Sequence, residues 1–175
     1  MVAREILRQH KKDVATRWVE AVFATYPLET AGFLRTKTDP FTNPVAHMTR
    51  EAANVLYDAA AGEEIDPEEV KAALDRFVHL RAVQKFAPSE NMAVIYMMKP
   101  LLREAILPEM LEKGQLQEYL LIESRIDTLA LLAFDIFTKA RETVAEARIK
   151  EIKNSHAQLA AWAQKLEGGA GKGNT

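Results

Sequence analysis

The stretch RAVQKFAPSENMAVIYMMKPLLRE, residues 81–104, decides the fold class of this chain. It reads as the end of one helix, a proline turn and the start of another. Its segment AVIYMM (93–98) is partly β-branched and aromatic, but it lies inside a stripe of apolar residues at helical spacing and has no flanking turn residues. No strand pattern competes elsewhere. The sequence therefore predicts an all-α protein.

Helical spacing also governs the residues before this stretch. A first helix is predicted over residues 3–24, ending before Pro27, because proline lacks the backbone donor that a continuing helix needs. Residues 26–44 contain three prolines and one glycine. We expect an irregular connection there, with one short turn of helix at residues 30–34.

Capping residues mark the ends of the next two helices. Asn43 is predicted to cap a helix that starts at the following proline and ends at Gly62. Asp66, again followed by a proline, is predicted to cap a helix that continues to about Lys85. Both side chains are short acceptors of the kind that bonds the first free backbone N–H groups of a helix.

Prolines divide the chain again before one long helix. Pro88 is predicted to start a helix, and Pro100 to kink it by removing one backbone hydrogen bond. Pro108 and Gly114 close the segment. Residues 115–166 then contain neither proline nor glycine, so a single helix of roughly 75 Å is predicted.

The predicted length of that helix sets the domain organisation. It exceeds the diameter of a domain of this size, so its second half must project or find a partner. We expect a helical domain over residues 1–141, a continuation of the last helix over 142–167, and a flexible glycine-rich tail over 168–175.

Composition limits the classes of function. The chain has 175 residues, of which 48% are apolar and 27% charged, as in one soluble globular domain. A formal net charge of −2, with acidic and basic residues interleaved, gives no sign of nucleic-acid binding. No apolar run is long enough to span a membrane, and the N-terminus lacks the apolar core of a secretory signal. Cysteine is absent. A cytoplasmic location is expected.

The search for catalytic motifs is negative. Glu-x-x-His pairs, His-Glu-x-x-His, phosphate-binding glycine loops and the Gly-x-Ser-x-Gly elbow are all missing, so we predict neither a metal site nor an enzyme. The histidines are scattered (His10, His47, His79 and His156). His79 is the one placed plausibly for a haem ligand, but the favoured interpretation is a histidine partly buried or at the surface with an ordinary partner, and no cofactor is expected.

Arg81 and Gln84 are the polar residues that call for an explanation. On a helix they share one face with Phe77, so they meet another helix or line a cavity. Two interpretations are open. Arg81 is a structural arginine satisfied by carboxylates or helix-end carbonyls, or it contacts a small ligand together with Gln84. With His79 and Trp18, these residues form the predicted ligand site.

Three strings of residues resemble a known family. They are NPVAHMTREAANVLYD (43–58), VHLRAVQKFAPSENMAVIYMMKPLLRE (78–104) and ESRIDTLALLAFDIFTKARE (123–142). Together they resemble the N-terminal sensory domain of RsbRD-type RsbT co-antagonist proteins, relatives of the stressosome subunit RsbR. The resemblance covers about residues 3–153.

The resemblance implies a globin-like helical input domain without haem that forms a homodimer, partly through its long C-terminal helix. In the family such domains commonly precede an output module, a STAS domain or a histidine-kinase core. Here only a glycine-rich tail follows residue 166. The output is therefore expected either from a domain outside this sequence or from a partner, such as a regulatory kinase.

A weak seven-residue repeat supports assembly through the last helix. Apolar residues recur every seven positions, with a second set between them (Ala145, Ile152, Leu159 and Leu166; Arg148, Ser155 and Trp162). Two polar residues make this a poor coiled coil. Ile152, Leu159 and Trp162 are nevertheless predicted to contact a partner, either a second copy or the protein's own core.

Two functions remain open from the sequence. The favoured one is a non-enzymatic sensory or regulatory module in stress or signal transduction, which detects a signal or ligand and acts through protein–protein interaction. The alternative is a carrier of a small molecule or haem in a globin-like pocket.

Overall fold

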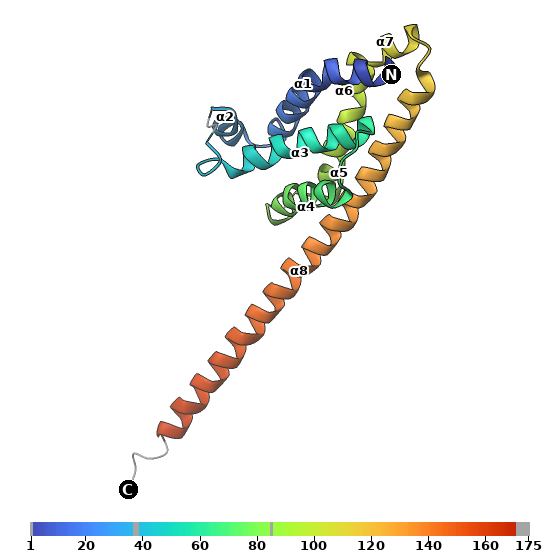
Figure 1. Cartoon of the computed structure of the whole chain (residues 1–175). Helices are drawn as coiled ribbons and strands as arrows, with labels where there is room; N and C mark the ends of the chain where they lie inside the picture. The colour runs from blue at the N-terminus through green and yellow to red at the C-terminus, as the bar shows by residue number, and fades with distance from the viewer. Residues whose placement is uncertain (1, 37–38, 85, 171–175) are drawn as a thin grey trace. The chain divides into compact units, whose positions relative to one another are not determined.

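The structure is a computed structural model that describes residues 2–36, 39–84 and 86–170, the last five by their backbone alone. Its described residues form eight α-helices and no strand, which confirms the all-α prediction (Figure 1). The chain divides into two compact units, residues 1–138 and 139–175. Of the tail predicted over residues 168–175, residues 168–170 continue the last helix and residues 171–175 lie outside the described residues, as do the side chain of Leu166 and residue Lys85.

The first three helices begin and end largely where the sequence predicts. α1 spans Val2–Phe23, α2 spans Leu28–Thr36 and α3 spans Pro44–Ala61. The second is longer than the single turn expected, because its buried residues Ala31 and Leu34 anchor it and outweigh the low helix propensity of its glycine. α1 packs against α3, and the two lie side by side in Figure 1.

The predicted caps of α3 and α4 are present. Asn43 Oδ1 accepts a hydrogen bond from the backbone N–H of Ala46 at 3.1 Å, and Gly62 ends α3 in the left-handed conformation. Asp66 Oδ1 accepts from the N–H of Glu68 at 3.0 Å and opens α4, Pro67–Val83. α4 packs against α3.

The prolines break the chain more completely than a kink. α5 (Pro88–Tyr96) and α6 (Met98–Ala105) are separate helices. The break lies at Met97, because Pro100 has no N–H to offer the carbonyl of residue 96. α7 follows as Leu107–Glu112.

α8, Leu116–Ala170, is the long helix that the sequence predicts. Within the first unit its buried residues face the other helices (Tyr119, Ile122, Ile126, Leu129, Ala130, Ala133 and Phe137). Two ion pairs join it to α6: Arg103 with Glu123 at 2.7 Å and Lys99 with Asp127 at 2.6 Å. In the described part of the chain, no helix has the length and apolar character needed to cross a membrane.

Candidate functional site

Arg81 lies in the last turn of α4 and is completely buried, with 0% of its surface exposed. Its Nε donates a hydrogen bond to Oδ1 of Asn91 in α5 at 3.0 Å, and its Nη1 donates to Oγ1 of Thr25 at 3.2 Å. Among the described residues no carboxylate forms an ion pair with it. Burial accordingly lowers the pKa of the Arg81 guanidinium.

Aromatic rings surround the guanidinium instead of acids. Its central carbon lies 3.8 Å from the ring centroid of Phe86, 5.7 Å from that of Tyr26 and 5.9 Å from that of Phe77. The faces of aromatic rings carry negative charge density, and they attract a cation most strongly where water is excluded. Three rings therefore supply part of the stabilisation that a carboxylate would otherwise give.

Two nitrogens of this cluster have no acceptor. Arg81 Nη2 and Asn91 Nδ2 are both buried, and neither has a hydrogen-bond partner among the residues that the structure describes. Buried polar groups in proteins are almost always paired, so each exception needs an explanation. Here the two exceptions belong to side chains that are bonded to each other.

A pocket of about 420 Å³ lies against the same aromatic residues. It is lined by Tyr26, Pro27, Thr30, Gln84, Phe86 and Glu90. The Tyr26 hydroxyl donates a hydrogen bond to Oε1 of Gln84 at 2.8 Å. Burial raises the pKa of Tyr26, while the nearby Arg81 charge acts in the opposite direction. Tyr26 and Phe86 thus contact both the pocket and Arg81.

The predicted ligand residues are distributed unequally. Arg81 and Gln84 belong to this one cluster. Trp18 is a core residue, since its Nε1 donates to the Val94 carbonyl at 2.7 Å. His79 is exposed, so it does not fit the enclosed pocket that a haem ligand requires. Among the described residues, no three acidic or histidine side chains are grouped as metal ligands would be.

As a structural arginine, Arg81 was predicted to donate its hydrogen bonds to carboxylates or helix-end carbonyls. In the structure it donates to neutral side chains, and aromatic rings surround it. The other members of the cluster, Asn91, Tyr26 and Phe86, were not among the residues predicted from the sequence. Asn91 carried a usable signal, because it lies three and four residues before the buried Val94 and Ile95 and therefore shares their face.

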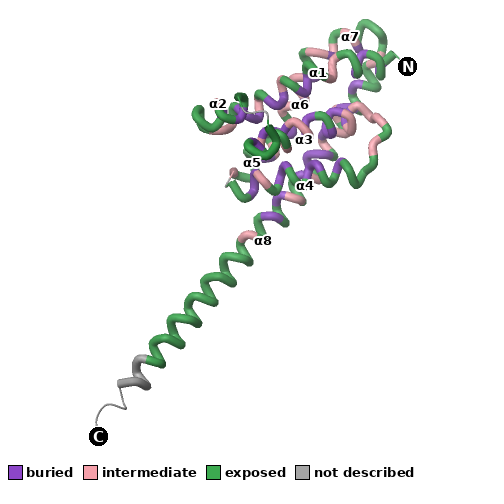
Figure 2. Tube along the Cα trace, turned by 60° about the vertical axis from the view of Figure 1, so that its left-hand side comes forward, coloured by how far each residue is buried: buried purple, intermediate pink, exposed green. Residues whose placement is uncertain are grey.

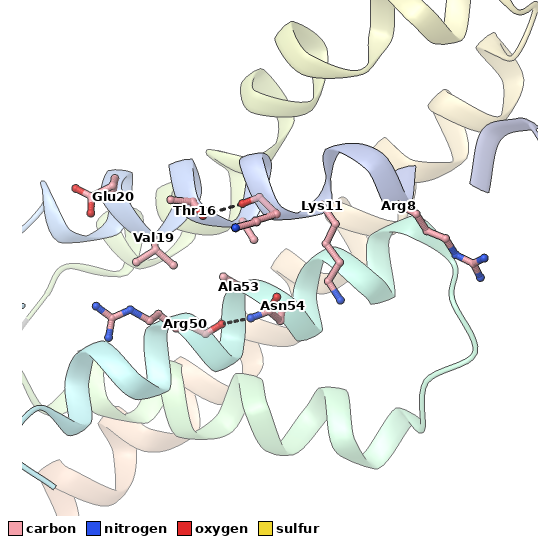
Figure 3. Close-up of a pocket in the computed structure, with 10 residues that line it drawn as sticks. Arg8, Lys11, Thr16, Val19, Glu20, Arg50, Ala53 and Asn54 are labelled. Carbon is pink, nitrogen blue, oxygen red and sulfur yellow. Dashed lines mark hydrogen bonds between the residues drawn. The ribbon is translucent and has the colours of Figure 1, made fainter. Parts of the chain in front are cut away.

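A second hollow, of about 560 Å³, lies between α1 and α3 (Figure 3). Arg8, Lys11 and Lys12 line it from α1 and Arg50 from α3. Two of these cations are paired, Arg8 with Glu63 and Lys11 with Asp58. The three- and four-residue spacing of the basic residues Arg8, Lys11 and Lys12 is a sequence signal that they share one side of α1.

The neutral polar residues that line this hollow, Thr16 and Asn54, are hydrogen-bonded within their own helices. Thr16 Oγ1 donates to the Lys12 carbonyl at 2.7 Å, and Asn54 Nδ2 donates to the Arg50 carbonyl at 2.9 Å, as Figure 3 shows. The hollow is lined mainly by basic residues. Among its lining residues, all of them described, no buried polar side chain lacks a hydrogen-bond partner.

The second unit carries large apolar side chains in contact with solvent. Ile152 is 58% exposed, and Leu159 and Trp162 are each 62% exposed. Figure 2 shows the exposed class along this part of α8. Leu131 and Phe134, in the first unit, are exposed as well. By sequence spacing they occupy the same positions of the seven-residue repeat. The repeat predicted from the sequence starts only at residue 145.

These features define the class of protein: an all-α domain with a buried, ring-enclosed cation and a long C-terminal helix that carries exposed apolar residues. The chain belongs to the family of the RsbT co-antagonist protein rsbRD N-terminal domain, whose family model matches residues 12–152. This match confirms the resemblance inferred from the sequence. The family implies a regulatory sensory domain of the stressosome type. No curated protein and no solved structure matches the chain, so the globin-like relationship stays a prediction.

Proposed function

We propose that the chain is a sensory input module that acts through protein–protein interaction and has no catalytic step of its own. The Arg81 cluster is the point where a small ligand binds, and the second unit is the surface that contacts a partner. Family membership supports the regulatory role. The exposed apolar side chains of α8 support the interaction, because single exposed residues are common but a repeated row of them is not.

The partner we propose is a second copy of the chain. Burying side chains of the size of Ile152, Leu159 and Trp162 yields about 1.5–3 kcal/mol each, and a long helix is marginal in water without packing on one face. A C2 dimer is the commonest symmetric arrangement that covers such a face on both copies. The dimer then presents its output to a further protein, of which a regulatory kinase is one candidate.

Sedimentation of the full chain against a version ending at Arg141 tests the dimer. We expect a dimer at tens of micromolar for the full chain and a monomer for the truncated one. Leu159→Ser with Trp162→Ser should also give a monomer, and Lys153→Ser on another face of the same helix should not. A monomeric full chain rules the dimer out, and an unchanged dimer after truncation moves the interface to the first unit.

The rival function is a carrier whose pocket is itself the purpose. A carrier would bind its ligand without any change in the dissociation constant of the dimer. Measuring the dimer constant with and without a bound ligand separates the two, since a sensor must bind its ligand differently in its two states.

A further inference from the structure

The free nitrogens of the Arg81 cluster lie on one hydrogen-bonded pair. Arg81 Nε and Asn91 Oδ1 are 3.0 Å apart, and the unpartnered Nη2 and Nδ2 are each attached to the same planar group as one of those atoms. The orientation of the Asn91 amide follows from its oxygen accepting from Arg81. Both remaining groups are therefore donors, and a ligand that reaches them must supply acceptors.

The positive charge of the cluster further limits the chemical class of the ligand. The guanidinium is fully buried and has no carboxylate partner among the described residues. A carboxylate offers two acceptor oxygens in one plane and a negative charge, and it matches the geometry of an arginine fork. A neutral amide or alcohol satisfies a donor but leaves the charge unpaired.

A route to the cluster passes Phe86. Its half-buried ring covers the guanidinium at 3.8 Å and meets the Tyr26 ring edge-on at 5.1 Å. It belongs to the short connection between α4 and α5, outside either helix. Phe86 thus lines the 420 Å³ pocket and also covers the guanidinium of Arg81.

We propose that Arg81 and Asn91 bind the carboxylate of a small organic acid that enters from the Tyr26–Gln84 pocket when Phe86 turns aside. The aromatic walls favour an acid with one carboxylate and an apolar body. The Glu90 carboxylate accepts a hydrogen bond from the backbone N–H of Ala87 at 2.7 Å. Its negative charge disfavours a second negative charge on the ligand. This inference rests on the proposed function, since it names the ligand class of the proposed input site.

Matched acids and amides test the proposal on the full chain. Acetate, butyrate and benzoate are titrated beside acetamide, butyramide and benzamide, with binding followed by calorimetry and by thermal shift. We expect at least one acid to bind about tenfold or more tightly than its amide, the ratio that a charge-assisted hydrogen bond gives. Equal binding of acid and amide, or no binding of any acid, overturns the proposal.

Asn91→Asp is the decisive variant, because it gives Arg81 a carboxylate partner from the protein itself and removes the Nδ2 donor that the ligand needs. It should raise the melting temperature of the free protein and abolish binding of the acid. Retained binding of the acid overturns the proposal. A buried water is the other candidate acceptor for Arg81 Nη2 and Asn91 Nδ2. In that case Asn91→Asp stabilises the protein, but the unchanged chain binds no acid. That result also overturns the proposal.

Phe86→Ala tests the route. It should accelerate association of the acid severalfold, whereas Phe41→Ala, a ring that is 96% exposed, should leave the rate unchanged. An unchanged rate in Phe86→Ala overturns the gate. The dimer measurements are independent of these titrations, so failure of the carboxylate site and failure of the proposed function can be told apart.

Discussion

Two buried asparagines show how much a single side chain decides in this protein. Asn43 uses both ends of its amide: the oxygen caps α3, and Nδ2 donates to the carbonyl of Leu34 in α2 at 3.2 Å. Asn91 uses only its oxygen. The Asn43 amide links α2 to α3. The Asn91 amide has a free Nδ2 donor beside the buried charge of Arg81.

Asn43→Ala should lower the free energy of unfolding by about 2 kcal/mol. An N-cap loss typically costs about 1 kcal/mol, and here the carbonyl of Leu34 loses a donor as well. Urea denaturation measures this, with the exposed Asn54→Ala as control, which should change stability by less than about 0.5 kcal/mol. Equal effects of the two substitutions would show that the cap contributes little.

Arg81→Ala should destabilise the protein by about 3 kcal/mol, because a large, fully buried side chain leaves a cavity. Arg81→Met keeps most of the volume and removes a desolvated charge, so its cost should stay near 1 kcal/mol. Since no carboxylate in the described part of the chain is bonded to Arg81, neither substitution strands an opposite charge there. A loss as large in Arg81→Met as in Arg81→Ala would show that the charge itself stabilises the fold.

At the scale of elements, the side chain of Arg125 in α8 lies against the end of α3. Gly62 has φ +75°, and a Cβ built on it would lie 2.7 Å from Nη1 of Arg125. That same nitrogen donates to the carbonyl of Ala60 at 3.2 Å. The glycine is therefore required for its backbone conformation and for the space that the Arg125 side chain fills.

Gly62→Ala and Gly114→Ala separate these two requirements. Gly114 also has positive φ, at +66°, but nothing lies within 4 Å of its added Cβ. We expect a loss of about 1 kcal/mol for Gly114→Ala from the backbone alone, and about 2 kcal/mol or more for Gly62→Ala. Thermal or urea melts measure both. Equal losses would mean that Arg125 moves aside without cost.

The pairing of α6 with α8 should depend on pH. The hydrogen bond from Arg103 holds the pKa of Glu123 below its usual value of 4.5. A lowered carboxylate pKa adds stability above about pH 4.5, and the gain is lost as pH falls through the lower, folded-state value. Glu123→Gln should therefore lower the melting temperature by a few degrees at pH 7, with the difference closing at more acid pH. Glu118→Gln, exposed on the same helix, should show no such trend.

The elements were predictable where local chemistry decides them. Asn43, Gly62 and Asp66 act through their nearest backbone groups, so their signals are readable in a few residues. The length of α2 depended on burial of Ala31 and Leu34 against distant helices, which no local pattern contains. The Arg81 cluster was half predictable: the helix face of Arg81 and Gln84 was readable, but Tyr26, Phe86 and Asn91 arrive from other elements.

At the scale of the whole molecule, the two tryptophans report on different units. Trp18 is fully buried and Trp162 is 62% exposed. In Trp18→Phe, fluorescence comes from Trp162 alone. If the chain dimerises through the second unit, its emission should move to shorter wavelength as the concentration rises through the dimer range. A constant wavelength alongside a dimer in sedimentation would place Trp162 outside the interface.

The ring-enclosed arginine also determines what kind of chemical sensor this molecule is able to be. A guanidinium keeps its proton at any pH at which a protein folds, so the cluster does not titrate in the physiological range. An organic acid held there as proposed would bind far more strongly as the anion than as the neutral acid. Acidification would therefore empty the site by protonating the free acid in solution, and the pH at which half the sites are vacated would follow the acidity of the ligand, with the protein contributing a fixed charge.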